Sequence, residues 1–247
     1  MTGLLASVTN VEEAHVALKA GADIIDLKDP ARGALGALPL ESIQSIVTTI
    51  GGRLPVSATV GDLPPDPDML SQSVMATAAT GVDLIKVGLF GEAYFASCLS
   101  TLGQHAAEGA RLIAVLFADL EPDFDIVARL AETGFTGIML DTADKTSGGL
   151  RRHMAVERLM HFVQRAKQLG LLTGLAGSLC QEDIKPLLVT AVDYLGFRTA
   201  LCRDRSRTAG IDPVAVAVIR SHLPRAPGAP NIGSHAQRTK RAGLGPA

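Results

Sequence analysis

Short apolar runs alternate with amphipathic stretches along most of this chain, and that alternation limits its fold more than any other feature. The expected strands are residues 4–8, 24–28, 55–60, 84–88, 112–117, 137–141, 172–176 and 194–198. The expected helices, with apolar residues at helical spacing, are residues 11–20, 40–50, 68–79, 93–107, 124–132, 155–169, 182–191 and 213–222. Eight strands that alternate with eight helices predict an α/β fold, a parallel sheet closed into a (β/α)8 TIM barrel.

Length and composition favour the same architecture. The chain has 247 residues, and such a barrel typically needs about 250. Apolar residues make up 47% of the chain and aromatic residues only 4%, which suits parallel strands covered by helices. The alternative is a doubly wound open sheet, but the turn at residues 6–10 lacks the glycines of a dinucleotide fingerprint. We therefore expect one barrel domain over residues 1–223 and a disordered tail over residues 224–247.

Lysines stand at the ends of expected strands, where catalytic groups of such barrels lie. The chain has 7 lysines against 16 arginines. Lys28 ends the second expected strand, Lys86 lies in the fourth, and Lys145 follows the sixth. Alternate strands contribute side chains to the same interior layer, so these three amines are expected to share one space.

Two aspartates accompany the lysines. Asp26 lies two residues before Lys28 and therefore on the same face of its strand, where we expect it to hold Lys28 in place. Asp141 ends the sixth expected strand. By the same alternation, Asp83 faces away from Lys86 and is expected only to begin its strand.

Several amines around one cavity repel each other's charge, so at least one is driven toward the neutral form. A neutral lysine adds to an aldehyde or ketone to form an imine, and a second lysine then moves protons beside the iminium carbon. This is the chemistry of class I aldolases. The alternative is that the lysines only balance nearby aspartates, which would be a costly way to build a core.

Small residues follow the seventh and eighth expected strands, where TIM barrels commonly bind phosphate through backbone N–H groups. Gly177 and Ser178 follow one strand, and Gly196 and Arg198 end the other. These four residues are the expected phosphate-binding set. The neighbouring residues Arg203, Arg205 and Arg207 are further candidates for charge at this site. The alternative is that the glycines only turn the chain.

Several other functions are disfavoured. The net charge of −2 leaves no nucleic-acid footprint, and no apolar run approaches the roughly 20 residues of a membrane span. The three cysteines are odd in number and follow no metal spacing, which is typical of reduced thiols. We expect no signal peptide, no metal, no cofactor and a cytoplasmic location. The partner is expected to be a small phosphorylated molecule, and assembly into a homo-oligomer stays open.

Several motifs together resemble one known family. They are Leu5–Val8, Asp23–Pro30, Gly33–Gly36, Val56–Asp62, Lys86–Leu89, Leu140–Lys145 and Gly174–Leu179. From about Leu4 to Leu223 the chain resembles the (5-formylfuran-3-yl)methyl phosphate synthases, also called 4-(hydroxymethyl)-2-furancarboxaldehyde-phosphate synthases. These are early enzymes of methanofuran biosynthesis, in one-carbon metabolism. Together the motifs are highly specific, although no single one would be.

The resemblance implies a TIM-barrel lyase that condenses two molecules of glyceraldehyde 3-phosphate into a furan aldehyde phosphate, with loss of phosphate and water. It implies that Lys28 forms the Schiff base and that Lys86 accepts protons. Asp26, Asp141 and Lys145 match the remaining active-site groups. Neither the furan product nor the triose substrate follows from composition or spacing.

Two other functions stay open from the residues alone. One is a different Schiff-base sugar-phosphate aldolase on the same scaffold, which would cleave its substrate reversibly. The other is a sensor of phosphorylated metabolites, in which the lysines would clasp phosphate without forming an imine. The loop residue Asp62 either lines the site or is a solvated carboxylate.

Overall fold

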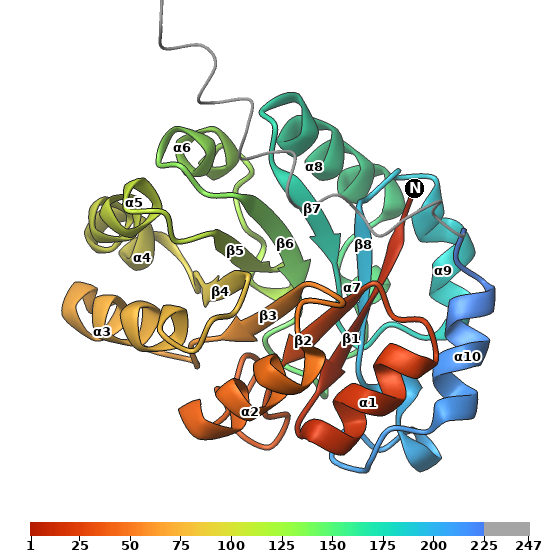
Figure 1. Ribbon diagram of the computed structural model, residues 1–247. Coiled ribbons are helices and arrows are strands. Elements are labelled where there is room, and N and C mark those ends of the chain that lie inside the picture. The colour runs from red at the N-terminus through yellow and green to blue at the C-terminus, as the bar shows by residue number, and fades with distance from the viewer. Residues whose placement is uncertain (225–247) are drawn as a thin grey trace, which may run out of the picture.

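A computed structural model of the protein describes residues 1–224, in which eight parallel strands close into a barrel (Figure 1). The strands are β1 (Gly3–Val8), β2 (Ile24–Leu27), β3 (Val56–Thr59), β4 (Leu84–Gly88), β5 (Leu112–Phe117), β6 (Gly137–Asp141), β7 (Leu172–Leu175) and β8 (Tyr194–Phe197). Each strand pairs with its neighbours in chain order, and β8 closes the sheet against β1. The predicted (β/α)8 architecture is confirmed. The tail predicted over residues 224–247 lies, except for Pro224, outside the described residues.

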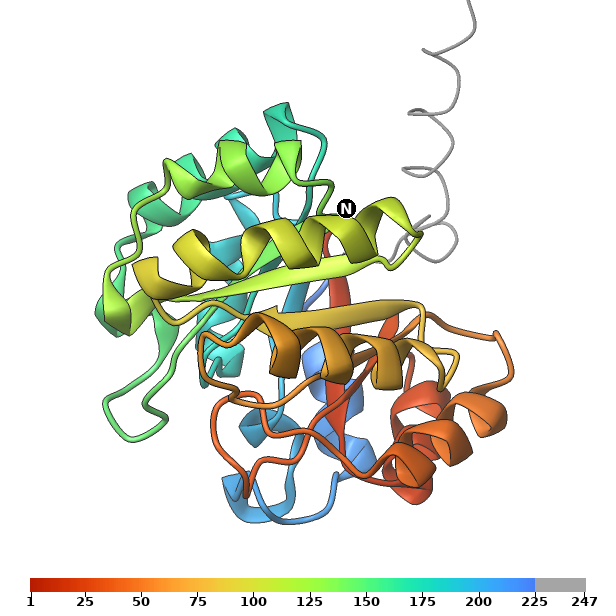
Figure 2. The same cartoon turned by 90° about the vertical axis from the view of Figure 1, so that its left-hand side faces the viewer.

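Helices surround the barrel on all sides, as Figures 1 and 2 show. They are α1 (Val11–Lys19), α2 (Leu40–Ile50), α3 (Pro67–Ala78), α4 (Glu92–Ser97), α5 (Leu99–Ala107), α6 (Ile126–Glu132), α7 (Leu150–His153), α8 (Val156–Gln168), α9 (Gln181–Leu188) and α10 (Pro213–Ser221). Short 3-10 turns are η1 (Ala118–Leu120), η2 (Thr199–Leu201) and η3 (Arg203–Arg205). No helix within residues 1–224 is long and apolar enough to cross a bilayer.

The expected helix over residues 93–107 is divided at Cys98 into α4 and α5. The Ser97 hydroxyl donates a hydrogen bond of 2.7 Å to the carbonyl of Ala93, one turn earlier. Such a bond competes with the backbone ladder and bends helices. The short helix α7 was not predicted, because four residues are too few for an apolar period to be visible.

Local signals explain where several elements begin. The Asn10 side chain caps α1 by accepting the N–H of Glu13, as its residue type favours. Asp83 precedes β4 and accepts the N–H of Val56 at 2.8 Å, so its carboxylate ties the start of β4 to that of β3. The predicted role of Asp83 as a residue that begins a strand is therefore confirmed.

Strand alternation divides the buried side chains between two cores. One set packs between the sheet and the helices, and the other fills the barrel interior. Apolar side chains such as Ile24, Leu84 and Tyr194 occupy the interior near the beginnings of the strands. Two residues further along β2 and β4, the inward positions carry Asp26 and Lys86. The interior therefore changes from apolar to charged toward the carboxyl ends of the strands.

Candidate active site

One cavity at the carboxyl ends of the strands contains all of the predicted site residues. Its lining includes Asp26, Lys28, Lys86, Asp141, Lys145, Gly177, Ser178, Gly196 and Arg198. Leu5, Ser7, Met139, Ala176, Phe197, Thr199 and Arg207 complete it. The barrel thus brings residues from six of the eight strands, or from the loops that follow them, to a single site.

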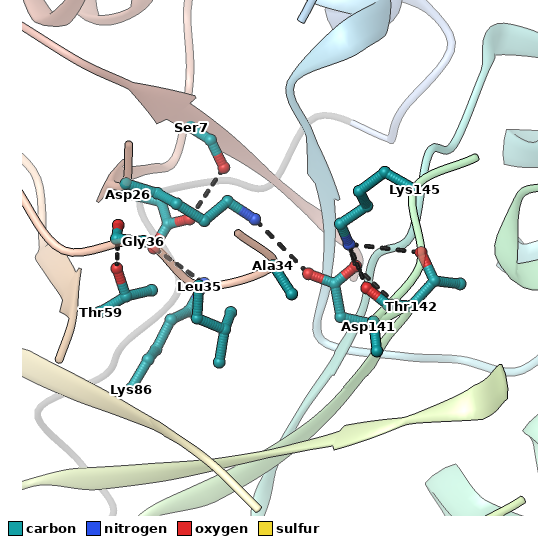
Figure 3. Close-up of polar contacts among 12 residues, drawn as sticks. Ser7, Asp26, Ala34, Leu35, Gly36, Thr59, Lys86, Asp141, Thr142 and Lys145 are labelled. Carbon is teal, nitrogen blue, oxygen red and sulfur yellow. Dashed lines mark hydrogen bonds and ion pairs between the residues drawn. The ribbon is translucent and has the colours of Figure 1, made fainter. Parts of the chain in front are cut away.

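Asp26 is the centre of the deeper part of this site (Figure 3). Its carboxylate oxygens lie 2.8 Å from the Lys86 amine, 2.8 Å from the Ser7 hydroxyl and 2.7 Å from the Ser57 hydroxyl. The strand register places Ser7 and Ser57 directly beside Asp26 on the two neighbouring strands. Asp26 and Lys86 are only 1% and 2% exposed. We call Asp26, Lys86, Ser7 and Ser57 the Asp26 cluster.

Burial disfavours the charged form of both Asp26 and Lys86. Burial alone would raise the pKa of Asp26, but the positive charges of Lys86 and Lys28 outweigh it and lower that pKa. Burial lowers the pKa of Lys86 and the charge of Lys28 adds to this, whereas Asp26 opposes both. The prediction that at least one of the clustered amines is driven toward the neutral form agrees with this direction for Lys86, although burial and not the neighbouring charge is the larger cause.

Asp141 is the centre of the second part, where two amines share one carboxylate. Lys145 approaches one oxygen at 2.5 Å, and Lys28 lies 3.5 Å from the other. Lys145 also donates to the carbonyl of Thr142, as Figure 3 shows. The N–H of Thr142 donates to Asp141 at 2.8 Å and fixes the carboxylate. We call Asp141, Lys28, Lys145 and Thr142 the Asp141 cluster.

The charges of the Asp141 cluster perturb each other strongly. Burial would raise the pKa of Asp141, but Lys145 and Lys28 lower it far below the usual range of a carboxyl. Burial lowers the pKa of Lys145, and the positive charges of Lys28 and Arg207 lower it further against the opposing effect of Asp141. One carboxylate cannot neutralise two ammonium groups, so this side of the cavity carries excess positive charge.

The partner predicted for Lys28 was wrong. We expected Asp26 to hold Lys28, but Asp26 pairs with Lys86, and the carboxylate nearest to Lys28 is Asp141. Residues two apart on a strand project in parallel, so their side-chain ends stay separated by about 6–7 Å. Side chains from different strands converge toward the barrel axis and come closer. The charge of Lys28 nevertheless contributes to the lowered pKa of Asp26.

The loop after β7 has an unusual backbone conformation beside the cavity. Gly177 has a φ of +110°, and a side chain there would meet Thr142 at 3.0 Å. Ser178 also has a positive φ, of 47°, which is uncommon for a residue other than glycine. Within residues 1–224, the N–H groups of Gly177 and Ser178 have no backbone or side-chain acceptor. Gly196 lies within β8 and contributes space rather than a donor.

Arg198 lines the cavity, but all of its N–H groups donate to oxygens of the protein itself. It donates to both oxygens of Glu13, at 2.6 and 3.2 Å, and to the carbonyl of Ser7 at 3.2 Å. It also donates to the carbonyls of Arg207 and Ala209, at 2.8 and 2.9 Å. These bonds account for all five N–H donors of a guanidinium.

Asp62 acts on the loop between β2 and α2. Its carboxylate accepts the N–H groups of Ala34 and Leu35 at 2.7 and 2.8 Å. Leu35 is only 1% exposed and packs with the side chains of the barrel interior. Asp62 therefore holds this loop over the mouth of the barrel and does not line the cavity.

Sequence reasoning missed the hydroxyl groups that satisfy the carboxylates, and it did not single out Arg207. Ser7 and Ser57 are polar residues at inward positions of β1 and β3, so alternation could have identified them. Nothing comparable marks Arg207, whose position depends on an irregular loop. Among residues 1–224, no three His, Cys, Asp or Glu side chains are grouped so as to hold a metal ion.

A closed parallel barrel with three lysines and two carboxylates in one cavity at the carboxyl ends of its strands defines a TIM-barrel protein with a lysine-rich site. The phosphoribosyl anthranilate isomerase of Thermotoga maritima has the same fold. It aligns with 90% of this chain and 98% of its own, with a TM-score of 0.67 and 14% sequence identity. At that identity the likeness concerns the fold alone.

The sequence comparisons identify the family. The model of the 4-HFC-P synthase family matches residues 4–220. A Methylorubrum extorquens protein, provisionally named as a (5-formylfuran-3-yl)methyl phosphate synthase, is 45% identical over 87% of this chain and 88% of its own. The (5-formylfuran-3-yl)methyl phosphate synthase of Methanothermobacter thermautotrophicus is 36% identical over 84% and 92%. The chain belongs to the 4-HFC-P synthase family and is a synthase enzyme of that kind.

Proposed function

We propose that this enzyme condenses two molecules of glyceraldehyde 3-phosphate into (5-formylfuran-3-yl)methyl phosphate through a Schiff base on Lys28. The atoms balance when one phosphate and two waters are released along with the furan. The observation that carries the proposal is the sharing of Asp141 by Lys28 and Lys145, with Lys86 in the same cavity. The family membership supports the furan product.

Lys28 is the proposed nucleophile because its amine has the least restrictive contact of the three. Lys86 and Lys145 lie 2.8 and 2.5 Å from carboxylate oxygens, whereas Lys28 lies 3.5 Å from one. The neutral amine adds to the aldehyde carbon of the triose, and loss of water leaves an iminium ion. When Lys28 becomes neutral, the Asp141 carboxylate keeps its ion pair with Lys145.

Lys86 is the proposed general base. The iminium makes the neighbouring C–H acidic, and an amine bound in the iminium cannot also accept that proton. Burial lowers the pKa of Lys86, so a larger fraction of it is neutral near the working pH than for a free lysine. After the proton is removed, the enamine carbon attacks the aldehyde of the second triose and forms the new carbon–carbon bond.

Phosphate recognition is proposed for the loops after β7 and β8. The unpaired N–H groups of Gly177 and Ser178 supply donors, and Gly196 leaves room beside them. The expected contribution of Arg198 is indirect in this proposal, because its five donors are already used.

Incubation of the enzyme with glyceraldehyde 3-phosphate alone tests the proposal. We expect a furan aldehyde phosphate by mass analysis and one inorganic phosphate for each furan formed. Borohydride added during turnover should reduce the imine and leave a triose-sized mass on the peptide that contains Lys28. Reversible cleavage without a furan would indicate a different Schiff-base aldolase, and a mass on Lys86 or Lys145 would refute the assignment of Lys28.

A further inference from the structure

The loop after β8 contributes two arginines to the cavity, and their hydrogen bonds differ. Arg198 donates all five of its N–H groups to protein oxygens. Arg207 donates one hydrogen bond within residues 1–224, to the carbonyl of Gly33 at 3.3 Å. We infer that Arg207, and not Arg198, is the guanidinium that binds a phosphate of the substrate, which rests on the proposed use of a triose phosphate.

Arg207 lies where it can reach both the active site and the loop above it. It lines the same cavity as Lys28, Asp141 and Lys145. Its charge is near enough to Lys145 to contribute to the lowering of the pKa of that amine, after burial and Lys28. Its bond to Gly33 joins the loops that follow β8 and β2, seen at the lower left of Figure 2. A phosphate entering between these loops meets donors that the protein does not use.

Arg198 has a different task, because it holds the segment that carries Arg207. Its guanidinium donates to the carbonyls of Arg207 and Ala209, so it fixes the backbone on both sides of Thr208. Glu13 on α1 accepts two of its bonds and neutralises its charge. Arg198 and Glu13 are buried, at 9% and 6% exposure. A buried arginine whose donors and charge are both satisfied contributes to position rather than to binding.

The balance of charge supports an anion at Arg207. The ion pair of Arg198 with Glu13 and that of Lys86 with Asp26 are balanced one to one. The remaining cations of the cavity are Lys28, Lys145 and Arg207, and the remaining carboxylate there is Asp141. These three cations and one carboxylate leave two positive charges without a partner. A phosphate monoester carries between about −1.5 and −2 charges at pH 7 and would neutralise them.

The other arginines of the loop provide matched controls. Arg203 and Arg205 lie within ten residues of Arg198, but both are exposed and neither lines the cavity. Replacement of Arg203 removes the same charge from the same loop without removing a donor from the cavity. Net electrostatic attraction and direct contact can therefore be separated.

The test compares Arg207→Gln with Arg203→Gln in two measurements. The first is borohydride trapping on Lys28 with glyceraldehyde 3-phosphate or with unphosphorylated glyceraldehyde. A lost hydrogen bond to a charged group costs about 1.5–3 kcal/mol, so Arg207→Gln should raise the half-saturating concentration of the phosphorylated triose about 10- to 100-fold. Trapping of glyceraldehyde should stay within about twofold, and Arg207→Lys should recover part of the phosphate preference.

The second measurement is calorimetric binding of inorganic phosphate, which needs no imine. Arg207→Gln should weaken that binding by a similar factor, and Arg203→Gln should leave it unchanged. Equal losses in the two variants, or an equal loss of trapping for both trioses in Arg207→Gln, would overturn the assignment of Arg207. If the unmodified enzyme traps neither triose, the proposed Schiff base fails, and the phosphate measurement still decides the role of Arg207.

Discussion

The Asp26 cluster and the Asp141 cluster use the same residue types in different proportions. In the Asp26 cluster one carboxylate meets one lysine and two hydroxyl groups, and both charged residues are at most 2% exposed. In the Asp141 cluster one carboxylate is shared by two lysines, and Lys28 is 8% exposed. In the Asp26 cluster the one positive and the one negative charge are equal in number and buried. The Asp141 cluster has one amine more than it has carboxylates, and its Lys28 is more exposed.

This difference supports the proposed roles of Lys28 as nucleophile and Lys86 as base. An amine that must attack a carbonyl needs access and freedom to lose its ion pair, and the Asp141 cluster provides both for Lys28. A base that accepts a proton needs a fixed position and a lowered pKa, and the Asp26 cluster provides these for Lys86. Exchanging or removing single members of the two clusters tests these roles.

The largest effect is expected for Lys28→Arg. Arginine keeps the positive charge but does not become a neutral nucleophile near neutral pH. Turnover and borohydride trapping should both fall below detection, while the thermal unfolding temperature changes little because the charge beside Asp141 remains. Product analysis, peptide mass and calorimetry measure these quantities. Residual turnover with a triose mass on Lys86 would reverse the roles of the two clusters.

Lys86→Ala should separate imine formation from the later steps. Removal of a general base typically costs about 10²- to 10⁴-fold in rate. Product formation should fall by that factor, whereas the triose mass should still be trapped on the peptide containing Lys28. Loss of trapping together with turnover would mean that the Asp26 cluster is already needed for binding or for activation of Lys28.

Asp141→Asn should reduce stability in a pH-dependent way. The pKa of Asp141 is lowered in the folded protein from the usual 3.8 of a free aspartate, mainly by Lys145 and Lys28. Its contribution to stability is therefore complete above pH 3.8 and is lost as the pH falls below that value. Removing the carboxylate from the buried amine of Lys28 and the half-buried amine of Lys145 costs roughly 3–5 kcal/mol at neutral pH. The variant should therefore lose more free energy of unfolding at pH 7 than at pH 3.

Asp23→Asn is the control for Asp141→Asn, because it also removes a carboxylate from an ion pair. Asp23 lies just before β2, pairs with Arg220 and does not line the cavity. It should reduce stability without changing the trapping of a triose on Lys28. Trapping that survives in Asp141→Asn at the rate of the unmodified enzyme would show that the shared carboxylate does not prepare Lys28.

The smallest effect is expected for Ser57→Ala in the Asp26 cluster. This change removes one of two hydroxyl groups that bond to Asp26, while the ion pair with Lys86 remains. A hydrogen bond to a charged group contributes about 1.5–3 kcal/mol, and denaturant unfolding should show a loss within that range. Ser45→Ala, on the exposed face of α2, should change stability by no more than about 0.5 kcal/mol. Equal effects of the two substitutions would contradict a role for Ser57 in holding Asp26.

Much of the site was predictable because a barrel imposes rules on strand ends. Lys28, Lys86 and Asp141 stand at inward positions of alternate strands, and alternation alone predicts that they meet. Partner choice was not predictable in the same way. Spacing along β2 suggested that Asp26 holds Lys28, yet convergence across the barrel pairs Asp26 with Lys86.

By itself the sequence determined the eight-fold alternation of strands and helices and which residues face the barrel interior. Those properties depend on periods of apolar residues, which are local. Only the tertiary structure decided that Arg198 donates its five N–H groups to Glu13 and to backbone carbonyls, while Arg207 lines the cavity with donors to spare. Glu13 and Arg198 are 185 residues apart in the chain, and hydrogen bonds between such distant residues follow from how loops close over the barrel, which no local period encodes.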